Sequence, residues 1–224
     1  MEKGRKRRKK NGYRGKAWIW MLAVLCLAGC GKSKETEEKQ LALRSEGIAK
    51  AQEGDYEGAI DSYEEALQLA DLHAGALERD IAAYKASALY HAGEMQKAID
   101  TFTAILDLKE SAEIYMARGM LYRESEKLTE AKADFTAAVG LTSKKDTLML
   151  GRLSYYMEDY NAAKSYLESA VKSGDREAVY WEAALYWEMG NTEYAITLYQ
   201  DYLSGEAPEH PEAYARVASW QIGQ

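Results

Sequence analysis

The chain has 224 residues, of which 29 are Lys or Arg and 36 are Asp or Glu, so its net charge is −7. The charges are unevenly distributed: residues 1–29 hold nine basic residues and one acidic residue, and the remaining 195 residues hold 20 basic and 35 acidic ones, a net charge of −15. Such an acidic body lacks the basic face that nucleic-acid binding requires, and its length suffices for one sizeable domain.

The first element is an apolar run of thirteen residues, 17–29, which follows the basic stretch MEKGRKRRKK. As a helix it would be roughly 20 Å long, shorter than the ~30 Å hydrocarbon core of a membrane, and this layout is typical of a secretory signal peptide. Its end, LAGC at residues 27–30, resembles the lipobox of bacterial lipoproteins. The resemblance implies that residues 1–29 are removed and that a lipid on Cys30 anchors the protein to the cell membrane, on the extracytoplasmic face. The alternative is a signal-anchor helix in which the cysteine is incidental.

The body contains a phrase that recurs five times with changes, first as GDYEGAIDSYEEAL and next as GEMQKAIDTFTAIL. Three kinds of position recur within it, at intervals of 39, 33, 32 and 32 residues. An alanine occurs at Ala59, Ala98, Ala131, Ala163 and Ala195. A large apolar residue follows four positions later, at Tyr63, Phe102, Phe135, Leu167 and Tyr199. A small residue lies twelve positions before each alanine, at Gly47, Ala86, Gly119, Gly151 and Ala183.

This pattern resembles the tetratricopeptide repeat, a helix–turn–helix unit of about 34 residues. The resemblance implies an all-α fold, a right-handed superhelical solenoid in which the small residues let paired helices approach and the large side chain packs beside them. About five repeats are expected within residues 40–209, after a signal peptide at 1–29 and a lipidated cysteine with a polar linker at 30–39. The expected repeat boundaries are 40–73, 79–112, 112–145, 144–177 and 176–209, and a half-repeat follows at 210–224.

The repeats depart from the family pattern at the turn between their helices. Three of them have a glycine there, Gly54, Gly93 and Gly190, whereas the other two have Glu126 and Glu158. The wide first interval and the scarcity of prolines between repeats also depart from it. These differences loosen the expected boundaries without changing the predicted fold.

The last element, PEAYARVASWQIG, begins at Pro211 and resembles the first half of a sixth repeat. Proline is well tolerated at the first position of a helix. The helix carries apolar side chains at Tyr214, Val217 and Trp220, although the ends of a solenoid are usually polar. We expect these side chains to pack on the fifth repeat, and the alternative is a face through which two copies associate.

The resemblance also implies where a partner binds, since the first helices of tetratricopeptide repeats line a concave groove. The groove positions of the middle and C-terminal repeats are rich in Tyr, Trp, Arg and Met, which are common in protein interfaces. The candidate partner-binding residues are Tyr90, Met116, Met120, Arg123, Arg152, Tyr155, Tyr156, Tyr180 and Trp187. The two arginines predict an extended peptide or a helix with an acidic end as partner. Packing between neighbouring helices is an equally good interpretation of Tyr155, Tyr156 and Trp187.

The sequence contains no recognisable catalytic, cofactor-binding or metal-binding motif. Cys26 departs with the leader and Cys30 is modified, which leaves no thiol for a disulfide or a zinc site. The histidines His73, His91 and His210 have no metal-ligand spacing, and we expect His73 and His210 in exposed turns. No enzymatic activity, cofactor or metal is therefore expected.

The sequence thus predicts a membrane-tethered, extracytoplasmic scaffold that binds a protein or peptide in a helical groove. Two alternatives remain open at this point. Exposed Tyr and Trp also stack on sugar rings, which would make the protein a binder of glycans or cell-wall polymer. The apolar last helix would instead suit a self-associating structural subunit of an envelope complex.

Overall fold

The computed structural model describes residues 33–70, 74–205 and 210–222, and this part of the chain consists of eleven α-helices with no strand. Five consecutive helix pairs and a single last helix form the expected all-helical solenoid. The pairs are α2 (Lys34–Gln52) and α3 (Tyr56–Gln68), α4 (Ala76–His91) and α5 (Met95–Leu108), α6 (Ala112–Glu124) and α7 (Leu128–Leu141), α8 (Thr147–Tyr156) and α9 (Tyr160–Lys172), α10 (Arg176–Glu188) and α11 (Thr192–Leu203), followed by α12 (Glu212–Ile222).

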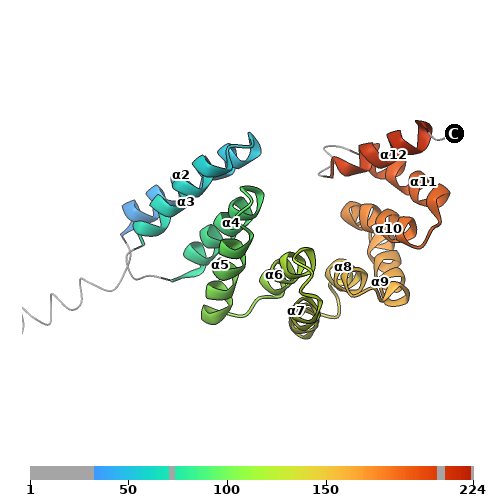
Figure 1. Cartoon of the computed structure of the whole chain (residues 1–224), viewed down its shortest axis with the longest axis horizontal. Helices are drawn as coiled ribbons and strands as arrows, with labels where there is room; N and C mark the ends of the chain where they lie inside the picture. The colour runs from blue at the N-terminus through green and yellow to red at the C-terminus, as the bar shows by residue number, and fades with distance from the viewer. Residues whose placement is uncertain (1–32, 71–73, 206–209, 223–224) are drawn as a thin grey trace, which may run out of the picture.

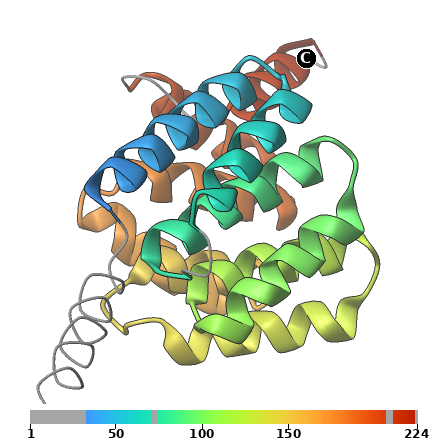
Figure 2. The ribbon, with the colours of Figure 1, turned by 90° about the vertical axis from the view of Figure 1, so that its left-hand side faces the viewer.

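The pairs follow one another in an arch, with α2 and α3 at one end and α12 at the other (Figure 1). In this view α6 lies on the inner side of the arch and α7 on the outer side. Figure 2 shows α2 running alongside α3, with the other pairs behind and below them. None of the helices in the described ranges combines the length and apolarity needed to cross a bilayer. The expected signal peptide, Cys30 and His73 lie outside the described residues.

The first helix begins earlier than the expected first repeat. The Ser33 side chain accepts a hydrogen bond from the backbone N–H of Thr36 and so caps α2. Glu35 and Lys39 form an ion pair one turn apart on the same helix. Residues 34–39, expected to belong to a polar linker, are therefore helical: the Ser33 hydroxyl caps the helix, and the charged side chains lie on its exposed surface.

The turn within each repeat requires one residue in the left-handed conformation. The glycines at this place, such as Gly54 and Gly93, have φ angles of 83° and 82°. Glu126 and Glu158 replace glycine in two repeats and adopt the same conformation, with φ angles of 59° and 62°. The turn is thus retained despite the substitution, at a cost of roughly 1–2 kcal/mol for each non-glycine residue held there.

Close helix crossings account for the small residue of each repeat. A Cβ added at Gly47 would lie 2.5 Å from Cε1 of Tyr63, and one added at Gly151 would lie 2.6 Å from Cδ2 of Leu167. Cβ atoms in proteins essentially never lie within 3.0 Å of a heavy atom of another residue in this way. The small and large positions of the repeat therefore pack against each other, which confirms the role that the sequence pattern predicts for them.

The buried core is divided into four clusters along the arch. They are centred on Tyr63, on Phe102, on Phe135 and on Tyr199, in that order. Each cluster draws its buried residues from helices that are consecutive in the chain. This arrangement is typical of solenoids, in which each repeat is stabilised by its immediate neighbours.

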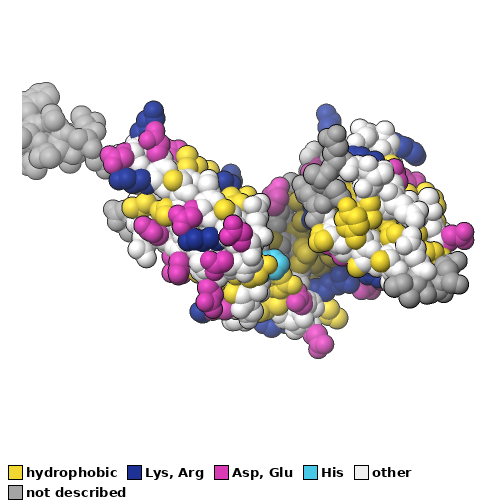
Figure 3. All heavy atoms as spheres, turned by 90° about the horizontal axis from the view of Figure 1, so that it is seen from above, with side chains coloured by type: hydrophobic (Ala, Val, Ile, Leu, Met, Phe, Trp, Pro, Cys, Tyr) yellow, Lys and Arg dark blue, Asp and Glu magenta, His cyan; other side chains and the backbone are white. Residues whose placement is uncertain are grey.

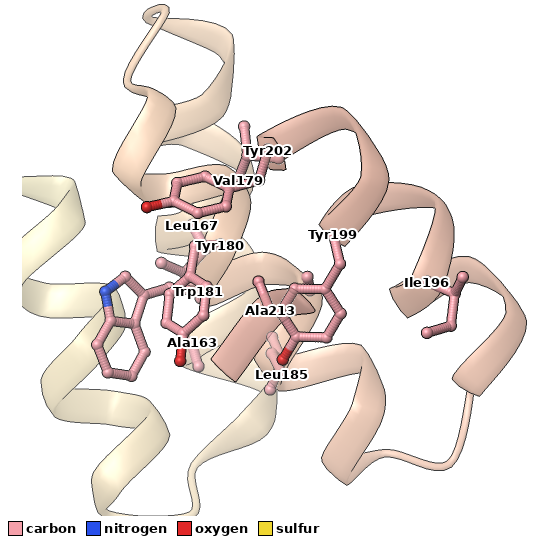
Figure 4. Packing of buried hydrophobic residues seen from close by; sticks show 11 residues of the cluster. Ala163, Leu167, Val179, Tyr180, Trp181, Leu185, Ile196, Tyr199, Tyr202 and Ala213 are labelled. Atoms are coloured by element: carbon pink, nitrogen blue, oxygen red, sulfur yellow. The ribbon is translucent and has the colours of Figure 1, made fainter. Parts of the chain in front are cut away.

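The last helix packs on the fifth pair, as expected. Ala213 of α12 is completely buried and lies among the side chains of α10 and α11, beside Tyr199 (Figure 4). Val217 and Trp220 are half-buried against the same cluster, whereas Tyr214 remains 54% exposed. The apolar side of α12 therefore closes the end of the solenoid and leaves one aromatic ring outside.

Candidate functional site

A hollow on the inner side of the arch separates α4 from α6. Its volume is about 690 Å³, within the usual range of ligand-binding pockets. Figure 3, a view from above, shows apolar side chains in the recess between the two ends of the arch. The pocket is lined by Asp80, Ala83, Tyr84, Ser87, Tyr90, His91, Phe102, Glu113, Ile114, Ala117, Met120, Leu121 and Glu124.

Small residues on the facing helices create this hollow. Ala83 and Ser87 face it from α4, and Ala117 faces it from α6, so no long side chain fills the gap. Phe102 of α5, only 6% exposed, belongs to the core beneath and lines the same pocket. Met120 is 36% exposed. The result is an open apolar surface on which a partner side chain could be buried.

Carboxylates stand at the edge of the pocket. Asp80 is paired with Arg44, whose Nε donates to its Oδ2 at 2.5 Å. The other two carboxylates, those of Glu113 and Glu124, accept hydrogen bonds from neutral hydroxyls, and in the case of Glu124 the donor is Tyr90 at 2.8 Å.

The pKa values of this edge follow from these hydrogen bonds. The hydrogen bond from the Ser111 hydroxyl lowers the pKa of the Glu113 carboxyl. The hydrogen bond to Glu124 raises the pKa of the Tyr90 hydroxyl, since that bond favours the protonated phenol. The lining residues in the described part of the chain include no Lys or Arg, so the pocket is apolar inside and negative at its edge.

A second hollow of about 340 Å³ continues the groove from α6 to α8. It shares Met120 and Glu124 with the larger pocket and adds Arg123 and Tyr156. The guanidinium of Arg123 lies 4.0 Å from the carboxylate of Glu158 and 5.9 Å from the centre of the Tyr156 ring. The groove therefore extends over α4, α6 and α8, the first helices of three successive pairs. Its charge changes from negative to mixed along its length.

The predicted site residues separate into two groups in the structure. Tyr90, Met120, Arg123 and Tyr156 line the two hollows. The remaining five are Met116, Arg152, Tyr155, Tyr180 and Trp187. None of these five is among the lining residues of either hollow, and their contact with a partner stays a prediction.

Internal packing explains the second group. Met116 and Tyr180 are each only 7% exposed and belong to the core. Arg152 lies 4.9 Å from the centre of the Trp181 ring, and Arg216 of α12 lies 4.4 Å from that of Trp187. The guanidinium of Arg152 thus contacts a ring of the same chain, and its role in binding a partner stays a prediction.

Sequence reasoning missed the acidic edge of the pocket. Asp80 and Glu113 lie near the starts of their helices, and their proximity depends on how α4 and α6 pack. The signal available in the sequence was the pair of small groove positions, Ala83 and Ser87, in one repeat where the neighbouring repeats have longer side chains. That signal indicates a hollow but not the charge around it.

His210 lies at a second polar site, between α10 and α12. Its Nε2 is 2.7 Å from Oε1 of Glu177 and its Nδ1 is 3.2 Å from Oε1 of Glu212. The imidazole stacks on Tyr180 with the ring centres 3.7 Å apart. The expectation of an exposed turn is therefore wrong: the side chain is 21% exposed, because the docking of α12 covers it.

Both partners shift the pKa of this histidine. Burial by itself lowers the pKa of His210, but the hydrogen bonds and charges of Glu177 and Glu212 outweigh it, so the pKa lies above its ordinary value of 6.5. Burial raises the pKa of both carboxyls, and the hydrogen bonds that they accept, from His210 and Trp181 for Glu177 and from Tyr180 for Glu212, bring it below the ordinary 4.5. Among the described residues, no group of His, Cys, Asp and Glu has an arrangement that could hold a metal ion.

This cluster predicts a pH-dependent stability. Because the pKa of His210 is raised on folding, the stability that the protonated His210 contributes is fully present below pH 6.5. It is lost as the pH rises through the pKa that His210 has in the folded protein. Because the pKa values of Glu177 and Glu212 are lowered on folding, the stability that the two carboxylates contribute is fully present above pH 4.5. It is lost as the pH falls through the pKa values that they have in the folded protein. The difference in Tm between the wild type and His210→Phe, which keeps an aromatic ring on Tyr180, should therefore be largest between these two pH values. Circular dichroism melts across this range measure it, and a difference that stays constant up to about pH 8 would refute the pairing.

Comparison with known proteins agrees with the succession of helix pairs. Sequence profiles described as tetratricopeptide repeat match residues 44–113, 112–145 and 148–211. The chain belongs to the tetratricopeptide repeat family. Among curated proteins, none matches it.

Solved tetratricopeptide structures share the fold at low sequence identity. A thermophilic TPR protein of Thermus thermophilus, TTC0263, is 19% identical with a TM-score of 0.63, covering 82% of this chain and 99% of that one. The Cut9–Hcn1 hetero-tetramer of the APC/C is 13% identical with a TM-score of 0.60, covering 93% of this chain but 40% of that one. A tetratricopeptide repeat protein from Parabacteroides merdae ATCC 43184 is 18% identical with a TM-score of 0.51, covering 83% and 74%. At these identities the likeness establishes the tetratricopeptide fold alone.

Proposed function

We propose that the protein is an interaction scaffold, tethered to a membrane through a lipid on Cys30, that binds a segment of another protein in the groove between α4 and α8. The observation that carries the proposal is the open apolar pocket of about 690 Å³ between α4 and α6. A monomeric fold gains nothing from leaving such a surface uncovered, and large apolar hollows with a polar edge are typical of binding sites. No catalytic step is proposed.

The tether rests on the sequence before the described residues. A basic stretch, a short apolar run and LAGC at residues 27–30 have the order expected of a lipoprotein signal. Two or more acyl chains on one residue give stable anchoring to a bilayer. The helical body would then present its groove on the extracytoplasmic side, where a partner in the envelope or at the cell surface would meet it.

Protein binding is favoured over the two alternatives by how the aromatic residues are used. Tyr155 and Tyr156 each pack edge-on against Trp181 at centre distances of 5.7 and 5.5 Å, so they do not form an exposed ladder for sugar rings. Val217 and Trp220 of α12 pack on the fifth helix pair instead of offering a face to a second copy. Tetratricopeptide folds also occur in assemblies such as the Cut9–Hcn1 hetero-tetramer.

Photocrosslinking in intact cells tests the proposal. A benzophenone amino acid at Met120, which lies in both hollows, should capture a discrete protein partner. The same group at Glu130, exposed on the outer helix α7, is the matched control and should not capture it. Equal capture at both positions, or no protein captured at Met120, would refute binding in the groove.

The same photocrosslinking experiment also tests the lipid anchor on Cys30. In cells carrying Cys30→Ala, the protein should leave the membrane fraction, and its leader should be processed slowly. Capture through Met120 should fall with it if the partner is itself held at the membrane. Unchanged partitioning of Cys30→Ala into detergent would refute the lipid anchor and favour the signal-anchor helix, without bearing on the groove.

A further inference from the structure

We infer that the α4–α6 pocket selects an amphipathic partner helix whose apolar side chains enter the hollow and whose basic residues flank them. The inference rests on the proposed function and adds to it the chemistry of the partner. It also reverses the sign of the charge that the sequence predicted for that partner, because the arginines on which the sequence prediction depended lie elsewhere or are engaged within the chain.

The charge of the pocket edge supports a basic partner. Within the described part of the chain, Asp80 is the one carboxylate of the three that has a basic partner, Arg44. Glu113 and Glu124 accept from hydroxyls, which stabilise a negative charge without neutralising it. A complementary potential steers association and excludes partners of like charge. An acidic segment would meet two uncompensated carboxylates on entering the hollow.

The positions of these carboxylates set a spacing for the partner. Glu113 lies in the first turn of α6 and Glu124 is its last residue. They are eleven positions apart in the helix, which corresponds to roughly 16 Å along the axis. A partner helix lying along α6 would therefore place basic residues about three turns apart, with its apolar side chains between them.

The apolar interior supports a helical partner over an extended one. A helix pairs its own backbone groups, whereas an extended segment buried in the hollow needs donors and acceptors from the pocket. Among the described lining residues, side-chain donors are limited to Tyr84, Ser87, Tyr90 and His91, and the Tyr90 hydroxyl already donates to Glu124. Phe102, Ile114 and Leu121 give the pocket apolar side chains. Apolar residues three or four positions apart on a partner helix would face this surface together.

Two fluorescein-labelled peptides of about fifteen residues serve as probes. Both carry leucines at helical spacing between two charged ends, which are lysines in one peptide and glutamates in the other. Fluorescence anisotropy with the full chain in a nonionic detergent should show the lysine peptide binding about tenfold more tightly, with a preference that falls as salt is added. Equal affinity for both peptides would overturn the inference.

Matched variants locate the effect. Glu113→Gln/Glu124→Gln should remove the preference, whereas Glu57→Gln/Glu130→Gln, two exposed carboxylates on the outer helices, should preserve it at the same net charge. Ser87→Trp fills the hollow from the exposed side of α4 and should abolish binding of both peptides, provided its melting curve is that of a folded protein. Binding that persists in Ser87→Trp would overturn the pocket as the site.

The outcomes separate this inference from the proposed function. If wild type binds both peptides equally and Ser87→Trp binds neither, the groove stands as a binding site and its charge preference is refuted. If neither peptide binds the wild type, the inference is refuted, and capture through Met120 in cells still decides the proposed function. If the lysine peptide binds as expected but Met120 captures no protein, the pocket chemistry stands and the cellular proposal fails.

Discussion

Replacing Gly119 by alanine is expected to lower the stability of the protein by about 2 kcal/mol, although alanine is the better helix former. The added Cβ would lie 2.7 Å from Cε1 and 2.9 Å from Cδ1 of Phe135, and 3.2 Å from Cβ of Asp134. Phe135 is 2% exposed and enclosed by its cluster, so its ring cannot move aside without opening α6 from α7. Thermal melts of the purified chain should show a Tm lower by about 4–8 °C.

Gly140 provides the matched control in the neighbouring helix. A Cβ added there meets nothing within 4 Å, so Gly140→Ala should gain the helix propensity alone, up to about 1 kcal/mol. The two substitutions are chemically identical and are expected to shift the Tm in opposite directions. A shift of the same sign in both would mean that the close crossing of α6 and α7 does not exist in solution.

Asp134→Asn is expected to cost about 3 kcal/mol, because it leaves a buried guanidinium without its counter-charge. Arg118 donates from Nε and from Nη2 to the two carboxylate oxygens of Asp134, both at 2.8 Å. The side chains are 15% and 6% exposed, and Nη1 of Arg118 also donates to the Thr103 hydroxyl of α5 at 2.9 Å. Through Arg118 the ion pair therefore links α5 of the second helix pair to α6 and α7 of the third. Chemical denaturation should show the lower free energy of unfolding of Asp134→Asn.

Asp61→Asn is the control for charge and size. Asp61 is exposed on α3, so the same substitution there should change stability by less than about 0.5 kcal/mol. The test also discriminates between a structural and a functional role for Arg118. If Asp134→Asn is as stable as Asp61→Asn, the ion pair contributes nothing to the fold and Arg118 is free for another use.

The fold could be predicted from the sequence because its determinants are local. The small and large positions of each repeat lie within one helix pair, so a fixed spacing in the sequence becomes a fixed contact, as between Gly47 and Tyr63. Even the two turns without glycine follow this rule, since Glu126 and Glu158 adopt the backbone conformation that the position demands. Because the pattern recurs in five repeats, the same contact between the small and the large position could be inferred several times from one chain.

The site could be predicted only in part, because it depends on contacts between repeats. Tyr155 and Trp181 come from different helix pairs, and whether their rings pack together or face solvent is decided by the angle at which the pairs stack. His210 and Glu177 are 33 residues apart in the chain and meet only because α12 docks on α10. The family resemblance therefore implied which helices face inward, but residue type at their groove positions did not show which side chains remain available.

The division of the core into four clusters bears on how a chain of this kind can change in evolution. A duplicated helix pair would bring most of its stabilising contacts with it and would have to form new ones only at its two seams. The connection at 142–146, mostly exposed between α7 and α8, is a seam at which such an insertion would leave the α4–α6 pocket and the docked α12 untouched. Within a pair the opposite holds, since even a methyl group added at Gly119 or Gly151 would lie less than 3 Å from a buried side chain. The length of the groove is therefore open to variation by whole units, while the interior of each unit admits almost none.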